Sequence, residues 1–315
     1  YAYKYLIVFW IGGILVSIYG VLQYFGIAPR FWGNLVLTPY AITSTLSWHH
    51  GHLGLYMLVI IFLTIGLYMI ASSKLWKITL GCSFSLFVYT EILSLRRTTW
   101  VGLAAGLILW IMFTQVHLNR KIKIYFASLF LIIMIFGGFY FTNPALKRLE
   151  VFTFSSSRII QGDEHKAINA RLTVMNYFID IIRQDPLSLV YGRGFMSSPM
   201  RYEYTGAHNE FIEKLHDSGI LGLIIYLWLL YSILKILWQH SRTGNDKWKP
   251  IYYSFFFAFI GLIFSSFTGG FFTVSHVFGS FLGFLLSLLS VIIASTYQAE
   301  YPNKIMPYNN QFKHN

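Results

Sequence analysis

The chain has 315 residues, of which 56% are hydrophobic and 11% are charged, and its formal net charge is +12. This composition excludes a soluble globular domain and is typical of a polytopic membrane protein. Lys and Arg are scattered at the ends of apolar segments instead of forming a basic stripe, so the charge favours membrane orientation and excludes nucleic-acid binding.

Eight apolar windows are long enough to cross a bilayer, which takes about 20 residues per helix. They are Tyr5–Phe25, Leu53–Ala71, Trp76–Leu95, Trp100–Val116, Ile124–Phe141, Ile220–Trp238, Ile251–Phe267 and Phe272–Ala294. We therefore expect an all-α bundle of eight membrane spans. The chain begins at Tyr1 without a methionine or a basic leader, so we expect further N-terminal spans in a longer protein. Cys82 lies inside an apolar window and is expected to be buried.

Lys and Arg are concentrated in three short connections, at residues 72–77, 117–123 and 239–250. If the spans alternate in direction, these connections share one side of the membrane, and the positive-inside rule makes it the cytoplasmic side. The expected organisation is a transmembrane bundle of five spans (1–141), a large external loop (142–218), a second part of the bundle with three spans (219–296) and a cytoplasmic tail (297–315).

The same alternation places three polar segments together on the external side: residues 26–52, the turn 94–100 and the large loop. Arg96 and Arg97 lie in this short turn, where the positive-inside rule disfavours cations, so they are candidates for a role other than orientation. Arg96 is either a second anion clamp or a cation that snorkels from a span end. Glu91 is costly in lipid and is expected to pair with Arg96 or Arg97.

Within the large loop, apolar residues recur at helical spacing over residues 167–185, and Asp185 followed by Pro186 ends the pattern. We expect an amphipathic helix whose apolar stripe lies in the membrane interface. Arg171 falls near its first turn, where the helix dipole disfavours a cation. The glycines on either side of Arg193 predict a tight turn, and an approach of backbone N–H groups to an anion is the alternative.

The loop closes on a short predicted helix, residues 208–219, with Gly219 near its end, and this helix leads directly into the next apolar window. His208 lies at the helix start, where the dipole disfavours the charged imidazolium and keeps a free-base nitrogen available near neutral pH. That is the state required of a general base. The nearby acids are expected on a solvated face or as ion-pair partners: Glu210, Glu213 and Asp217.

Four short motifs follow one another along the chain. They are Arg-x-x-Trp-x-Gly (Arg97, Trp100, Gly102), Asn-x-Arg (Asn169, Arg171), Tyr-Gly-x-Gly-Phe (Tyr191–Phe195), and His-Asn-Glu-Phe followed by Ser-Gly-Ile-Leu-Gly (His208–Phe211, Ser218–Gly222). From residue 40 to residue 290, this order with the large outer loop resembles the bacterial O-antigen ligase and O-antigen polymerase superfamily. The aromatic residue that the family usually has four positions after the loop arginine is Met175 in this chain.

The resemblance implies a glycosyltransferase of the bacterial inner membrane that takes a glycan from undecaprenyl pyrophosphate on the periplasmic or external face. It implies no metal, nucleotide sugar or other cofactor. Arg97 and Arg171 would face the pyrophosphate of the donor, and His208 would activate the acceptor hydroxyl. The partners implied are the lipid-linked donor, a glycan or lipid A-core acceptor, and membrane lipid. Supporting roles are assigned to Arg96, Arg193, Asn209 and Glu210.

The residue types suit this chemistry, because arginine donates bidentately to phosphate oxygens and a sugar hydroxyl that attacks an anomeric carbon gains from a base. The alternative from another class is a transporter or flippase for lipid-linked glycans, which predicts paired ionisable residues and broken helices at mid-membrane. The ionisable residues gather on one face instead, which favours the enzyme. A sensor or scaffold explains neither Arg97 nor His208. Ligase and polymerase activities both stay open at this point.

Overall fold

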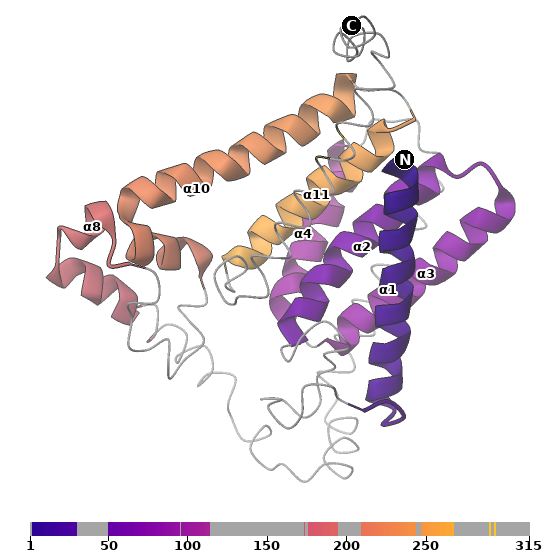
Figure 1. Cartoon of the computed structure of the whole chain (residues 1–315), viewed down its shortest axis with the longest axis horizontal. Coiled ribbons are helices and arrows are strands. Elements are labelled where there is room, and N and C mark those ends of the chain that lie inside the picture. The colour runs from indigo at the N-terminus through magenta and orange to yellow at the C-terminus, as the bar shows by residue number, and fades with distance from the viewer. Residues whose placement is uncertain are drawn as a thin grey trace, which may run out of the picture.

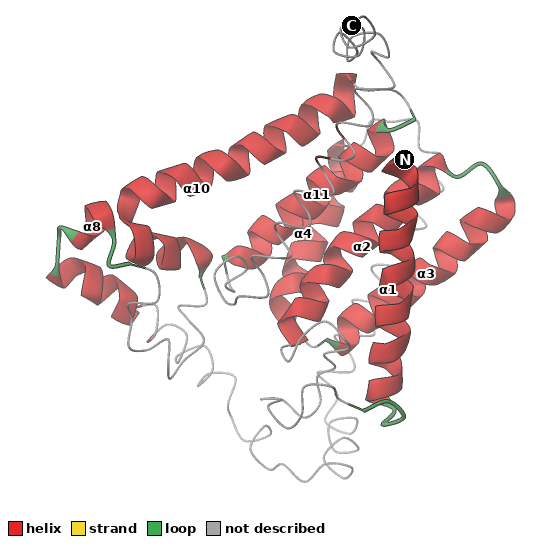
Figure 2. Ribbon diagram, viewed as in Figure 1, coloured by secondary structure: helices red, strands yellow, loops and turns green. Residues whose placement is uncertain are grey.

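The computed structural model describes residues 2–29, 50–94, 96–113, 173, 176–194, 209–243, 247–267, 290 and 293, and within these ranges the regular structure is helical (Figure 1). The labelled helices are α1 (Ala2–Tyr24), α2 (His50–Ile70), α3 (Lys74–Leu93), α4 (Arg97–Phe113), α8 (Ser188–Tyr191), α10 (Glu210–Thr243) and α11 (Lys249–Ser266). A further helix, 176–184, precedes α8. Figure 2 shows helices, turns and short loops but no strand among the described residues, so the predicted all-α class is confirmed.

Four of the described helices are long and apolar enough to cross a membrane: Tyr3–Tyr24, His52–Ile70, Glu210–Thr243 and Lys249–Ser266. Each coincides with one of the predicted spans. Two more predicted spans correspond to α3 and to α4, the latter a shorter apolar helix from Thr98 to Phe113. The predicted spans at 124–141 and 272–294 lie outside the described residues. The chain is a polytopic helical membrane protein.

The centre of the bundle is α2, which packs against α1, α3, α4 and α11. Its residues from Leu53 to Leu67 are buried on all sides, as expected for a helix that is apolar around its whole circumference. The closest helix pair is α4 with α11. A Cβ atom added at Gly102 would lie 2.2 Å from the carbonyl oxygen of Gly261, so only glycine lets these two backbones approach.

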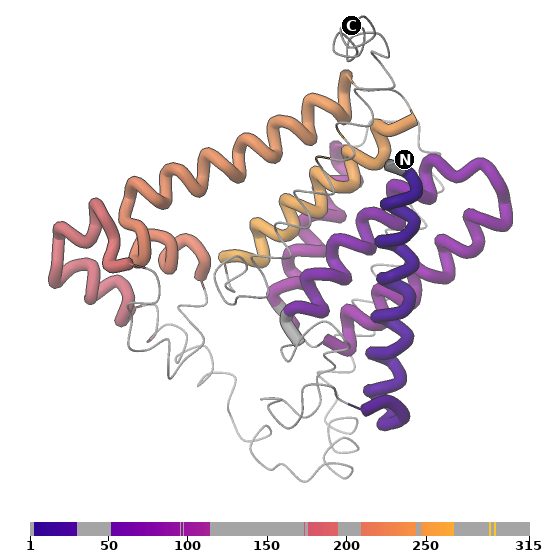
Figure 3. The backbone as a smooth tube through the Cα atoms, viewed as in Figure 1, coloured from indigo at the N-terminus to yellow at the C-terminus, as the bar shows by residue number. Residues whose placement is uncertain are grey.

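The helix α10 has one face against the bundle and one face away from it. Tyr226, Leu230, Ile233 and Leu237 are buried and recur at helical spacing, whereas apolar residues on other faces are exposed, among them Ile224, Ile225, Trp228 and Tyr231. Exposed apolar side chains in such numbers suit contact with lipid. Figure 3 shows the long part of α10 diverging from α11 towards a kink, beyond which its first segment turns back towards the end of α11.

Local signals in the sequence account for several helix ends. Ser73 caps α3 by accepting a hydrogen bond from the Trp76 amide at 3.1 Å, and Pro250 lies in the first turn of α11, where its missing N–H costs nothing.

The expectation that Cys82 is buried was wrong, because this residue is exposed. A bundle surrounded by lipid is apolar on both its inner and outer faces, so an apolar sequence does not indicate which face a residue takes.

Candidate functional site

Two helix N-termini are fixed to the end of α11. The hydroxyl of Ser265 donates to the Thr98 carbonyl in the first turn of α4, at 3.1 Å. The side-chain amide of Asn209, just before α10, donates to the carbonyl of Phe267 at 3.0 Å. These bonds bring the turn that contains Arg97 and the segment that follows His208 to one end of the bundle, as the alternation of spans predicted.

The turn between α3 and α4 is held by a buried polar cluster. The hydroxyl of Thr99 bonds the Glu91 carboxylate and lies 2.8 Å from the carbonyl oxygen of Arg96, while the Trp100 indole donates to the Glu91 carbonyl at 3.1 Å. The start of α2 presses on this cluster, since a Cβ atom at Gly54 would lie 2.7 Å from the Thr99 hydroxyl oxygen. The position of the turn is therefore fixed by α2, α3 and α4 together.

Of the two arginines in this turn, the structure describes the side chain of Arg96 and only the backbone of Arg97. Arg96 is half-buried, and its Nε donates to the Thr98 hydroxyl at 3.0 Å. Arg97 is the first residue of α4, and its side chain lies outside the described part of the chain. A cation in the first turn of a helix opposes the helix dipole and is favourable only when an anion binds there. The Glu91 carboxylate bonds Thr99 and also interacts electrostatically with Arg96, one of the two arginines expected to pair with it.

Asn209 is the cap of α10. Its Oδ1 accepts hydrogen bonds from the amides of Phe211 and Ile212 at 3.0 and 3.1 Å, while its Nδ2 reaches Phe267. Its described role is thus structural: it starts the helix and ties that start to α11. His208 immediately precedes this cap in the sequence and, like Arg171, lies outside the described residues.

The acids of the first segment of α10 are buried, which contradicts the solvated face expected from the sequence. The exposed fractions are 0% for Glu210, 1% for Glu213 and 7% for Asp217. Asp217 has a polar partner, since its Oδ1 lies 3.1 Å from Nδ1 of His216, a contact that is an ion pair when the imidazole is protonated. The sequence analysis missed His216, which is 1% exposed and packs edge-on against the Phe178 ring at a centroid distance of 4.8 Å.

The loop helix, 176–184, ends before Asp185 and Pro186 as predicted. Its apolar stripe does not lie only in the membrane interface, because Phe178 is fully buried against Ile212 and His216 of α10. The stripe is therefore at least partly a protein contact.

The turn after α8 is the tight turn that its glycines predicted, with φ of 76° at Gly192 and 92° at Gly194. The amides of Arg193 and Gly194 donate to the carbonyls of His216 and Asp217 at 2.8 and 3.0 Å. They are engaged within the protein, so the alternative of an anion held by these amides is not supported.

The chain was compared with models of known protein families. Residues 82–227 match the family model described as O-antigen ligase, a stretch that runs from the middle of α3 through α4 and the large loop to the kinked start of α10. The chain carries an O-antigen ligase family domain. Members of the O-antigen ligase family are O-antigen ligase or polymerase glycosyltransferases that use lipid-linked glycans. A search of curated proteins finds no match.

All three residues assigned to the chemistry, Arg97, Arg171 and His208, lie within the O-antigen ligase match. Across the part of the chain that the structure describes, His, Cys, Asp and Glu form no group of three or more that could hold a metal ion. The described end of the bundle gathers the arginine turn, the start of α4 and the start of α10, the last of which is capped by Asn209.

Proposed function

We propose that this chain transfers a glycan from an undecaprenyl-pyrophosphate carrier to an acceptor hydroxyl on the external face of the bacterial inner membrane. The observation that carries the proposal is the fixing of both helix N-termini, those of α4 and α10, to the end of α11. This arrangement supports the proposal because the backbone next to Arg97 and the residue after His208 both lie at the end of α11, and the proposed reaction needs a pyrophosphate and an attacking hydroxyl to meet.

The reaction breaks the bond between the anomeric carbon and a pyrophosphate oxygen, and its electron pair stays on the pyrophosphate. Arg97 and Arg171 stabilise the added negative charge, a task that suits the planar, permanently charged guanidinium. The acceptor oxygen forms the new glycosidic bond while His208 takes its proton, a contribution of about 10² to 10⁴ in rate. Asn209 and the α11 end hold the start of α10 in place.

The proposed reaction is tested with purified, membrane-reconstituted protein and a purified undecaprenyl-pyrophosphate-linked glycan. We expect loss of the donor, release of undecaprenyl pyrophosphate and growth of the acceptor. Supplying either lipid A-core or a second lipid-linked glycan as acceptor separates ligase from polymerase activity. Movement of intact donor across the bilayer without its consumption would contradict the proposal and indicate a flippase.

The proposed external site also predicts the membrane orientation. In a Cys82→Ala background, a cysteine placed at Ser198 in the large loop should react with a membrane-impermeant thiol reagent in intact cells. A cysteine at Asn245, in the Lys-rich and Arg-rich connection after α10, should react only after permeabilisation, because the positive-inside rule makes this connection cytoplasmic. Labelling at 245 but not at 198 in intact cells would reverse the orientation.

A further inference from the structure

A joint connects the turn after α8 to the kink of α10. Gly219 has φ 66° and ψ −170°, which interrupts α10 and leaves carbonyls at the end of its first segment without helical partners. The turn supplies those partners: the amide of Arg193 donates to the His216 carbonyl at 2.8 Å, and that of Gly194 donates to the Asp217 carbonyl at 3.0 Å. The kink and the turn therefore complete each other's backbone hydrogen bonds.

The joint leaves no room for side chains at its two central glycines. A Cβ atom at Gly192 would lie 2.3 Å from the Asp217 carbonyl oxygen, and one at Gly219 would lie 2.2 Å from the Val190 carbonyl oxygen. Both glycines also have positive φ, which other residues rarely adopt. The two segments meet backbone to backbone, so the joint fixes their relative position tightly.

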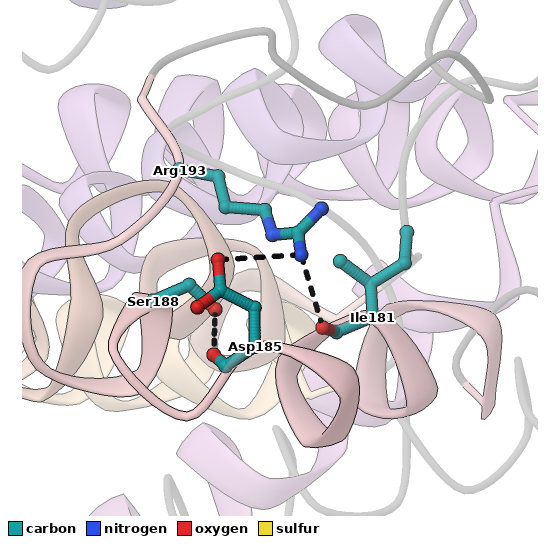
Figure 4. A network of polar contacts seen from close by, with 4 residues as sticks. All are labelled: Ile181, Asp185, Ser188 and Arg193. Carbon is teal, nitrogen blue, oxygen red and sulfur yellow. Dashed lines mark hydrogen bonds and ion pairs between the residues drawn. The ribbon is translucent and has the colours of Figure 1, made fainter.

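The side chain of Arg193 extends the joint to the loop helix. Its Nη2 lies 3.4 Å from the Ile181 carbonyl and 3.5 Å from a carboxylate oxygen of Asp185, at the C-terminal end of helix 176–184 (Figure 4). A cation at this end of a helix also interacts favourably with the helix dipole. The helix is thus held at two points: by Arg193 at its end and by Phe178 packed on the first segment of α10.

We propose that Arg193 is a positioning residue, which holds helix 176–184 in register with the first segment of α10. This inference rests on the proposed function, because Arg171 precedes that helix in the sequence and His208 precedes that segment. The joint connects the two pieces of chain that follow the donor-binding arginine and the base. Arg193 acts by setting their separation and does not itself bind the donor.

A double-mutant cycle separates positioning from direct binding of the donor. Arg193→Ala is expected to lower kcat by about tenfold or more, since small misplacements of reacting groups are costly, with a smaller change in the KM for donor. Asp185→Asn should give a loss in the same direction, and the double variant should be no worse than Arg193→Ala alone. Were Arg193 a donor ligand, Asp185→Asn would keep full activity and Arg193→Ala would mainly raise KM.

The matched control is the pair Arg183 and Asp180 on the same helix. Its N–O distance is 3.3 Å and its side chains are 76% and 57% exposed, against 35% and 46% for Arg193 and Asp185. The control pair also lies within one helix and reaches no other element in the described structure, whereas Arg193 comes from a different segment. Arg183→Ala should therefore leave kcat and KM unchanged, as is usual for exposed ion pairs. A loss equal to that of Arg193→Ala would mean that removing any cation on or next to this helix lowers activity, and would overturn the assignment.

A crosslink tests the positioning directly and without reference to activity. In the Cys82→Ala background, cysteines at Tyr177 and Ile212, which both pack on Phe178 and leave it in place, are joined by a short bifunctional thiol reagent, and the yield of crosslink is read on a gel. The yield should fall in Arg193→Ala, stay high in Arg183→Ala, and be unaffected by His208→Ala. Closing the bridge should restore transfer in Arg193→Ala. A bridge that forms fully without restoring transfer would show that Arg193 acts on the substrate instead.

The crosslink yield also tests the glycine contact with a matched pair. Gly192→Ala and Gly194→Ala both place a side chain at positive φ, but only the first clashes with the Asp217 carbonyl, since a Cβ atom at Gly194 meets nothing within 4 Å. Gly192→Ala should lower the yield well below that of Gly194→Ala. Equal yields would mean that the joint does not hold the helix.

Discussion

His208→Ala is expected to abolish glycan transfer while leaving expression, membrane insertion and donor binding near wild type. The reason is chemical: alanine offers no group to take the acceptor proton, a loss of about 10² to 10⁴ in rate. His208→Gln should be as inactive, because glutamine hydrogen-bonds but does not accept a proton at neutral pH. Transfer is measured with purified lipid-linked donor, and donor binding is measured separately.

Asn209→Ala is the neighbouring control for this experiment. It removes the cap of α10 and the bond to Phe267, which should lower stability by about 1 kcal/mol, but it leaves the proposed base intact. We expect partial activity at reduced thermal stability, in contrast to a stable and inactive His208→Gln. An active glutamine variant would remove His208 from proton transfer and leave it as a positioning residue.

Local chemistry in the sequence was enough to place the ends of several helices near the site. Asp185 followed by Pro186 ends the loop helix, and Gly219 interrupts the chain where the predicted short helix meets the span. The gathering of the α4 and α10 starts followed from counting spans, because an even number of crossings returns the chain to the same face. These inferences needed no knowledge of which helices touch.

Burial within the site depended on tertiary contacts that the sequence does not encode locally. Glu210, Glu213 and Asp217 recur at helical spacing, a pattern that describes a solvated stripe and a buried one equally well. The structure shows all three acids buried, and Phe178 of the loop helix packs on His216, the neighbour of Asp217. The tight turn at Arg193 was predictable from its two glycines, whereas the acceptors of its side chain, Ile181 and Asp185, follow only from the tertiary structure.

Arg97→Lys is expected to lower transfer by roughly 100-fold, corresponding to about 3 kcal/mol, with normal membrane insertion. Arg97 begins α4, and the bonds from Ser265 and within the Glu91 cluster fix the backbone of that turn, so the lysine variant should keep the fold. Lysine preserves the charge but loses the fork that donates two parallel hydrogen bonds to phosphate oxygens.

The loss in Arg97→Lys should appear mainly in kcat, since the charge on the leaving pyrophosphate grows in the transition state. Arg96→Lys should cost less, because the described bond of Arg96 is to Thr98 of its own turn. The two variants change neighbouring residues of the same turn. Their turnover, and the amount of each protein recovered in the membrane fraction, are therefore compared side by side. Wild-type turnover in Arg97→Lys would mean that Arg97 acts only in membrane orientation or in packing. Arg171 would then be the remaining arginine proposed to stabilise the leaving group.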